Sequence, residues 1–190
     1  MGDAQWDCAS GDGRLRPFER GRAAREHGTV DRVIAEEDPR TPEVAALLGR
    51  HLRFAGEVTP EGHVHALDVD GLVDPAVTFF AARDDGALVG VGALRALDPS
   101  HGEIKSMHTA VEARRSGVGR AVLDHLLATA WARGYERVSL ETGTMDAFAP
   151  ARDLYTAAGF TMCAPFGDYT TNPHSVCMTL TLTADRRRGG

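Results

Sequence analysis

VEARRSGVGRAVLDHLL, residues 111–127, places two arginines and two glycines directly before an amphipathic helix. The first turn of a helix presents backbone N–H groups without partners inside the helix, together with the positive end of the helix dipole. Such a helix end binds anions, and glycines allow a phosphate group to approach the backbone closely. The stretch therefore predicts an anion site at the start of this helix.

Strand and helix patterns precede this turn. Apolar and polar residues alternate in the strands, whereas apolar residues recur at helical spacing in the helices. The Asp-Gly pair at 85–86 is a strong hairpin signal. The expected elements are a strand over 29–36, a helix from Pro42 with Thr41 as N-cap, a short helix within 63–71, two hairpin strands within 76–97, and a strand over 102–111.

The pattern after the turn alternates between helix and strand. The helix has Val118, Val122, Leu126 and Leu127 on one face and ends near Gly134. Residues 102–142 are expected to form a strand, a turn, a helix and a second strand, and this order predicts a right-handed crossover between two parallel strands. The whole chain thus predicts an α/β domain with a mixed, mostly antiparallel sheet. The remaining expected elements are a strand over 137–142, a short helix within 146–158 followed by Gly159, and strands over 160–163 and 175–182.

Composition is that of an ordinary globular protein, with 43% hydrophobic and 25% charged residues among 190. This length suits one domain with a real core. No apolar run is long enough for a transmembrane helix, and the first residues lack the apolar core of a secretory signal. Three cysteines, Cys8, Cys163 and Cys177, form no CxxC pair, so we expect a reducing, cytoplasmic setting.

The two ends of the chain differ from its middle. Residues 1–28 lack an apolar period and predict a disordered extension, and residues 185–190 predict a solvated tail. The expected domain therefore spans 29–184. Its net charge is −8, because the whole chain carries −6, the first segment is balanced and the tail carries +2. So negative a domain disfavours nucleic acid as a partner.

The residues of the turn by themselves allow three interpretations. A P-loop needs Lys-Ser/Thr after its last glycine, and none follows Gly119. A dinucleotide fingerprint needs a third glycine where Val122 stands. A plain strand–helix turn without a ligand is disfavoured by the two adjacent arginines and two glycines.

The turn resembles the coenzyme A-binding motif of the GNAT superfamily of N-acetyltransferases, which places R-x-x-G-x-G after a strand and before a helix. Here Arg114, Gly117 and Gly119 match that motif. The following LDHLLATAWARGYERVSLET resembles the family's helix and next strand. ARDLYTAAGF, at 151–160, resembles the family's A-x-x-LY-x-x-x-GF helix.

This resemblance implies a single GNAT-type domain with a splayed central strand pair, helices on both faces and acetyl-CoA as acetyl donor. Backbone N–H groups of residues 115–120 would surround the donor's pyrophosphate, and the preceding strand would face its pantetheine arm. The family often has Asn where Phe148 stands, so that contact is missing or supplied otherwise. The implied donor site consists of Met107, His108, Thr109, Arg114, Arg115, Ser116, Gly117, Val118, Gly119 and Arg120, without a metal.

The resemblance also implies the catalytic residues. Tyr155 matches the family's usual acid, which would protonate the departing thiolate. Glu103 and Glu141 stand where different branches of the family carry their base, and a water chain is the third option. In a strand without a bulge, Glu103, Lys105, Met107 and Thr109 share one face.

The acceptor is less defined than the donor. His63 and His65 are a weak metal pair and could instead line the acceptor mouth, while Asp168 and Tyr169 lie in a polar loop that could contact an acceptor. The predicted function is acetyl transfer to a primary amine of a small molecule or protein, and the alternative is a catalytically silent acyl-CoA-binding module. Many members of the family dimerise, so a homodimer is an expectation that no sequence feature decides.

Overall fold

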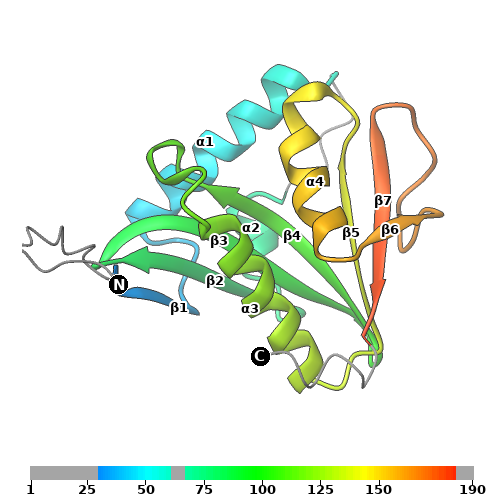
Figure 1. Ribbon diagram of the computed structural model, residues 1–190, viewed down its shortest axis with the longest axis horizontal. Coiled ribbons are helices and arrows are strands. Elements are labelled where there is room, and N and C mark those ends of the chain that lie inside the picture. Colours follow the sequence, from blue (N-terminus) through cyan, green and yellow to red (C-terminus); the bar gives the residue numbers. More distant parts are fainter. Residues whose placement is uncertain (1–29, 61–66, 183–190) are drawn as a thin grey trace, which may run out of the picture.

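The structure, a computed structural model, describes residues 30–60 and 67–182 (Figure 1). The expected extension 1–28, the tail 185–190 and the His63–His65 pair lie outside these ranges. None of the helices within them is long and apolar enough to cross a membrane.

A seven-stranded sheet forms the centre of the fold, in the order β1-β2-β3-β4-β5-β7-β6. Every neighbouring pair is antiparallel except β4 and β5, which are parallel as the crossover predicted. The strands are β1 (Arg32–Glu36), β2 (Val77–Asp84), β3 (Ala87–Asp98), β4 (His101–Thr109), β5 (Arg137–Gly143), β6 (Thr161–Cys163) and β7 (Ser175–Thr181).

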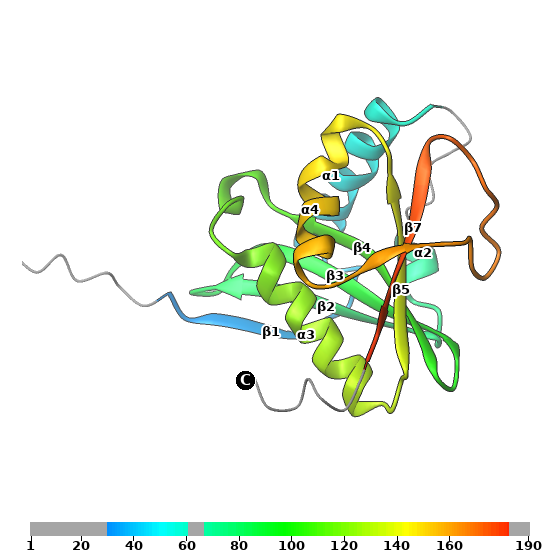
Figure 2. The same cartoon turned by 45° about the vertical axis from the view of Figure 1, so that its right-hand side comes forward.

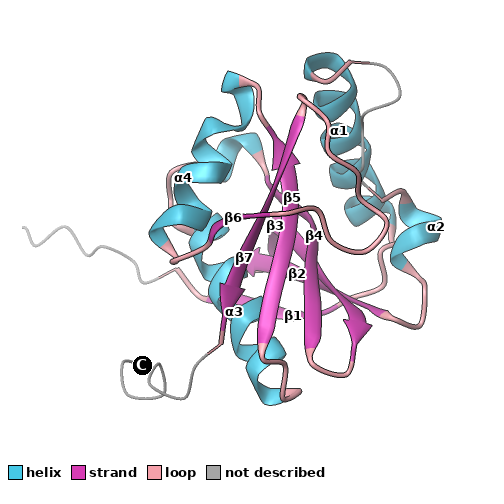
Figure 3. Ribbon diagram, turned by 90° about the vertical axis from the view of Figure 1, so that its right-hand side faces the viewer, coloured by secondary structure: helices cyan, strands magenta, loops and turns pink. Residues whose placement is uncertain are grey.

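Helices cover both faces of the sheet, as the resemblance implied (Figure 3). One face carries α3 (Val118–Ala132) and α4 (Ala149–Ala157), with two short 3₁₀ turns, Val111–Ala113 and Asp146–Phe148, before them. The other face carries α1 (Pro42–Val58) and the short α2 (Val69–Leu72). In Figure 2 α4 stands in front of the sheet and α1 behind it.

Each face has its own apolar core. The α3 side is built from residues such as Leu94, Val122 and Leu126, and the α1 side from Leu47, Phe79 and others, all almost fully buried. Burial of this apolar surface is what holds the helices to the sheet. Thr41 is the N-cap of α1 as expected, but its side chain makes no capping hydrogen bond.

The parallel pair of strands separates halfway along its length. β4 and β5 pair only from His101↔Arg137 to Ile104↔Leu140, although β4 continues to Thr109 and β5 to Gly143. Figure 1 shows the two strands meeting at the lower right and diverging toward the top. The expected splay is therefore present, and it leaves the inner edges of both strands without a strand partner.

A β-bulge in β4 corrects the expected side-chain alternation. Ala93 pairs with Lys105 and Val91 with His108, so β4 has one more residue than β3 in this interval. Ser106 absorbs it with a φ of 52°. Beyond the bulge the faces exchange, because side chains alternate strictly along a strand. Glu103 and Lys105 point to the α1 side, whereas Met107 packs against the α3 side near Gly92.

Candidate active site

The predicted anion-binding turn lies in an exposed loop that leads into α3. Arg115 has a φ of 63° and Gly117 a φ of 84°, a left-handed conformation that glycine adopts without strain. The hydroxyl of Ser116 donates to the carbonyl of Ala113 over 2.7 Å, which closes the turn. Arg32 of β1 donates to the carbonyl of Ser116 over 3.4 Å. The turn is thus held from both sides, and the backbone at the N-terminus of α3 faces solvent.

Gly119 lies where a ligand could approach the helix. A Cβ built there would meet only Thr109 Oγ1 at 3.4 Å and Leu154 Cδ2 at 3.6 Å, which are ordinary contacts. The protein itself therefore has room for a small side chain at this position. The guanidinium of Arg120 forms an exposed ion pair with Asp124, with an N–O distance of 2.8 Å. Arg120 can therefore contribute its backbone N–H, rather than its side chain, to an anion at the turn.

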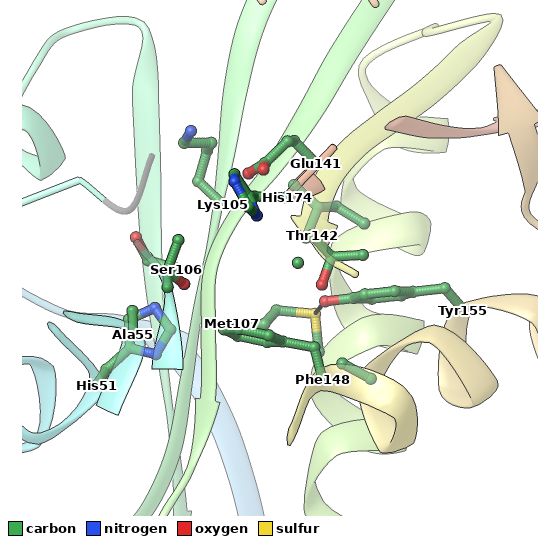
Figure 4. Close-up of a pocket in the computed structure, with 14 residues that line it drawn as sticks. His51, Ala55, Lys105, Ser106, Met107, Glu141, Thr142, Phe148, Tyr155 and His174 are labelled. Atoms are coloured by element: carbon green, nitrogen blue, oxygen red, sulfur yellow. Dashed lines mark hydrogen bonds between the residues drawn. The ribbon is translucent and has the colours of Figure 1, made fainter. Parts of the chain in front are cut away.

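A pocket opens where β4 and β5 separate (Figure 4). It brings together Met107, Glu141 and Tyr155, three residues that the sequence assigned to one site. The pocket is lined by Ile104, Lys105, Ser106 and Met107 of β4, Glu141, Thr142 and Gly143 of β5, Phe148, Ala151 and Tyr155 near α4, His51, Ala55 and Thr59 near α1, and His174.

Tyr155 lies at the α4 side of this pocket and is 7% exposed. Its hydroxyl points to the sulfur of Met107 at 3.8 Å (Figure 4). Burial, and then the nearby carboxylate of Glu141, raise the pKa of Tyr155 well above its ordinary value. The phenol is thus held protonated at neutral pH and can donate a hydrogen bond or a proton.

The two candidate bases lie in different surroundings. Glu141 lines the pocket together with Tyr155. Glu103 is 1% exposed and outside this pocket, where its carboxylate accepts from the Tyr169 hydroxyl over 2.6 Å. Lys105 Nζ lies 3.5 Å and Arg95 Nη1 3.7 Å from the Glu103 carboxylate. Of the two glutamates, Glu141 is therefore the one that shares a pocket with the phenol.

His108 faces α1 rather than the pocket. Its Nδ1 lies 3.2 Å from Nδ1 of His51, so a hydrogen bond links β4 to α1. Burial is the main cause that lowers the pKa of both histidines, and the pKa of His108 falls to about 4. His108 and Thr109 can therefore contribute backbone groups to a donor site, while the His108 side chain joins two elements.

Phe148 shows what replaces the family's asparagine. Its ring lines the pocket and makes an edge-to-face contact with Phe54 of α1, with ring centroids 5.4 Å apart. A Cβ built at Gly143 would overlap this ring, so the glycine makes room for it. An apolar wall thus stands where the family often has an amide.

Several site residues carried no sequence signal. His51 and His174 reach the pocket from α1 and from the loop before β7, and no motif includes them. Ser106 Oγ is buried beside the pocket without a hydrogen-bond partner among the described residues. In residues 30–60 and 67–182 no group of three or more His, Cys, Asp or Glu side chains could hold a metal ion.

These features fit an acyl-CoA donor. The strand edges beyond Ile104 and Leu140 offer unpaired backbone groups, the α3 turn offers exposed N–H groups, and Gly119 leaves room for a phosphate. An extended pantetheine arm could lie along β4 as a further strand would. Its thioester end would then reach the pocket that holds Tyr155 and Glu141.

Comparison with known proteins places this chain among the acetyltransferases. The model of the Acetyltransferase (GNAT) family matches residues 44–160, more than half of the chain, and the chain belongs to that family. Its curated relatives are themselves named as acetyltransferase enzymes, so this chain is an acetyltransferase.

Two relatives and one solved structure illustrate the likeness. The chain is 46% identical to the uncharacterized N-acetyltransferase YsnE of Bacillus subtilis over 74% of this chain and 93% of that protein. It is 36% identical to a protein named IAA acetyltransferase from Azospirillum brasilense, over 77% of this chain and 95% of that one. A Klebsiella pneumoniae structure, described as a candidate acyl-CoA N-acyltransferase, is 26% identical with a TM-score of 0.67, covering 80% and 99% of the two chains.

The buried histidine pair predicts a loss of stability in mild acid. An unfolded histidine titrates near 6.5, whereas His108 titrates at about 4 in the folded chain. Between these values the unfolded state binds more protons, so the free energy of unfolding falls as pH falls through this window. His108→Gln removes this proton uptake and should flatten the dependence between pH 7 and pH 5.

Urea unfolding curves at pH 8, 7, 6 and 5 provide the measurement. The values at pH 8 serve as the control, because both histidines are neutral there in the folded and the unfolded chain. If the free energy of unfolding falls equally with pH in the wild type and the variant, the histidine pair does not cause the acid sensitivity.

Proposed function

We propose that this acetyltransferase transfers the acetyl group of acetyl-CoA to a primary amine of a small molecule or protein by direct attack. Three features carry this proposal: the exposed turn that leads from β4 into α3, the open edges of β4 and β5, and the Tyr155–Glu141 pair in the pocket between those edges. The first two features suit a coenzyme A donor, and the third suits acid–base chemistry.

The donor would lie with its pyrophosphate at the backbone N–H groups of residues 115–120. Its pantetheine arm would follow the free edge of β4 past Met107, His108 and Thr109. This course places the thioester in the pocket at the splay. The Klebsiella relative supports an acyl-CoA donor by the name it bears.

In the transfer step, the amine nitrogen attacks the thioester carbon and the carbon–sulfur bond breaks. Glu141 would take a proton from the amine, directly or through water. Tyr155 would give a proton or hydrogen bond to the departing thiolate, and its raised pKa supports this role because the phenol stays protonated. The products are an amide and coenzyme A.

The alternative function is a silent acyl-CoA-binding module. Both functions predict coenzyme A binding, but only the enzyme consumes acetyl-CoA when an amine is present. The buried phenol beside Glu141 favours the enzyme, because simple donor binding needs neither group.

A panel of acceptors tests the proposal. Purified protein with acetyl-CoA is offered amino acids, spermidine, kanamycin, a peptide with a free N-terminus, and IAA, which the name of the Azospirillum relative suggests. Release of the coenzyme A thiol above the rate without acceptor is the expected result for at least one amine. Coenzyme A binding with no release for any member of the panel would favour the silent module.

Gly119→Ala tests the phosphate site without disturbing the fold. The new methyl group meets only ordinary contacts in the protein, and alanine favours a helix over glycine. It would nevertheless stand where the pyrophosphate approaches the backbone. We expect coenzyme A affinity to fall by at least about tenfold, a loss of about 1.4 kcal/mol, in isothermal titration calorimetry.

Gly56→Ala is the matched control, because Gly56 lies in α1 with no atom within 4 Å of the built Cβ. This control should bind coenzyme A as the wild type does. Equal affinity in both variants would move the donor away from the α3 turn.

Tyr155→Phe tests the acid. The ring remains packed beside Phe160, so the fold should persist. Because general acid catalysis contributes roughly 10²–10⁴-fold, kcat should fall by at least about tenfold with coenzyme A affinity nearly unchanged. Steady-state rates with the best acceptor of the panel, beside calorimetry, measure both quantities. A kcat within about twofold of the wild-type value, less than general acid catalysis supplies, would assign Tyr155 to packing.

Glu141→Gln tests the base and keeps the shape of the side chain. We expect kcat to fall most at lower pH, where the amine acceptor is mostly protonated and needs a proton acceptor. The pH dependence of kcat for Glu141→Gln and Glu103→Gln, measured side by side, gives the comparison. A wild-type profile for Glu141→Gln, together with a kcat that falls most at lower pH for Glu103→Gln, would reverse the assignment.

A further inference from the structure

The loop between β6 and β7, residues 164–174, crosses the α1 side of the sheet (Figure 3). Its last residue, His174, lines the pocket at the splay. The end of this loop therefore contributes to the wall of the pocket. What holds the loop in place decides the shape of that wall.

One anchor fixes the end of the loop. The backbone N–H of Thr144 donates to the carbonyl of His174 over 3.0 Å, and its hydroxyl donates to the carbonyl of Pro173 over 2.9 Å. These bonds tie the loop to the end of β5. These bonds do not hold the middle of the loop, which is fixed by a different contact.

The middle of the loop is anchored by the hydroxyl of Tyr169. Lys105 Nζ donates to this oxygen over 2.6 Å, and the hydroxyl donates to Glu103 over 2.6 Å. Both partners belong to β4 and are at most 8% exposed. One hydroxyl thus bridges a buried ammonium and a buried carboxylate, and such charge-assisted hydrogen bonds are about twice as strong as neutral ones.

The ring of Tyr169 strengthens this anchor. The ring makes an edge-to-face contact with Phe166 of the same loop, with centroids 5.1 Å apart. Lys105 itself also lines the pocket that holds Glu141 and Tyr155. The anchor and the pocket therefore share a residue.

We propose that Tyr169 is a positioning residue that latches the β6–β7 loop onto Lys105 and Glu103 and thereby sets the acceptor wall of the active site. The proposal rests on the proposed function, because it assigns the wall to the acceptor. In this arrangement Glu103 holds the loop in place through Tyr169 and does not act as the base. The proposed donor contacts, at the α3 turn and at Met107, His108 and Thr109 of β4, do not include Tyr169 or Glu103.

Tyr169→Phe is the direct test, because it removes the bridging oxygen and keeps the ring. Hydrogen exchange needs no ligand and reports the loop itself. Amides of residues 166–172 should exchange at least about tenfold faster than in the wild type, as expected for loss of a charge-assisted hydrogen bond. Amides of α3 and β5 should keep their rates.

The kinetic arm uses the best acceptor of the panel. The acceptor KM of Tyr169→Phe should rise by about fivefold or more, since binding must then order the loop. The coenzyme A dissociation constant and kcat at saturating acceptor should stay within about twofold, because Tyr169 does not line the pocket that holds Tyr155 and Glu141. Glu103→Gln should show the same split.

Tyr135→Phe is the matched control, because that buried ring packs on the α3 side, next to Gly102. It should change neither the exchange of residues 166–172 nor the acceptor KM. Wild-type exchange in Tyr169→Phe, or an unchanged acceptor KM, would overturn the latch. If the wild type acetylates no amine, the proposed function fails, and the exchange arm alone still accepts or rejects the latch.

Discussion

The separation of β4 and β5 beyond Ile104 and Leu140 is the constraint on which the rest of this structure depends. Backbone N–H and C=O groups need partners, and here two strand edges in the middle of a sheet lack strand partners. An extended ligand can satisfy one of these edges as an added strand would. The separation also creates the space into which Met107, Glu141 and Tyr155 project.

Much of the fold could be predicted because its signals are local. The Asp-Gly hairpin, the parallel crossover and the glycines that end α3 and α4 follow from short patterns, and each lies where it was expected. The convergence of Glu141 and Tyr155 was predictable from the family resemblance, since each stands in a matching motif.

The rest of the site depends on long-range packing and on one irregularity. Ser106 takes a left-handed conformation, and serine gives no warning of it as glycine would. This single bulge puts Met107 and Lys105 on opposite faces of the sheet, so strict alternation misplaced the end of the strand beyond Ser106. The pairing of His51 with His108, 57 residues apart, likewise has no local signal.

The fold separates the two carboxylates that the sequence left as alternatives. Glu141 follows the splay and lines the same pocket as the phenol, whereas Glu103 precedes it and lies among Lys105, Arg95 and Tyr169. A buried carboxylate held between cations and a hydroxyl is suited to fixing structure, because removing its partners would leave a costly buried charge. The proposed base and the proposed positioning carboxylate thus lie on neighbouring strands, on either side of the point where the strands separate.

Hydrogen exchange of the wild-type protein with and without coenzyme A tests the central claim most directly. If the splay and the α3 turn hold the donor, amides of residues 106–109 and 115–120 gain protection when coenzyme A is added. Protection confined to the cleft that includes Arg95, His101 and Arg137, with none at the splay, would contradict the account.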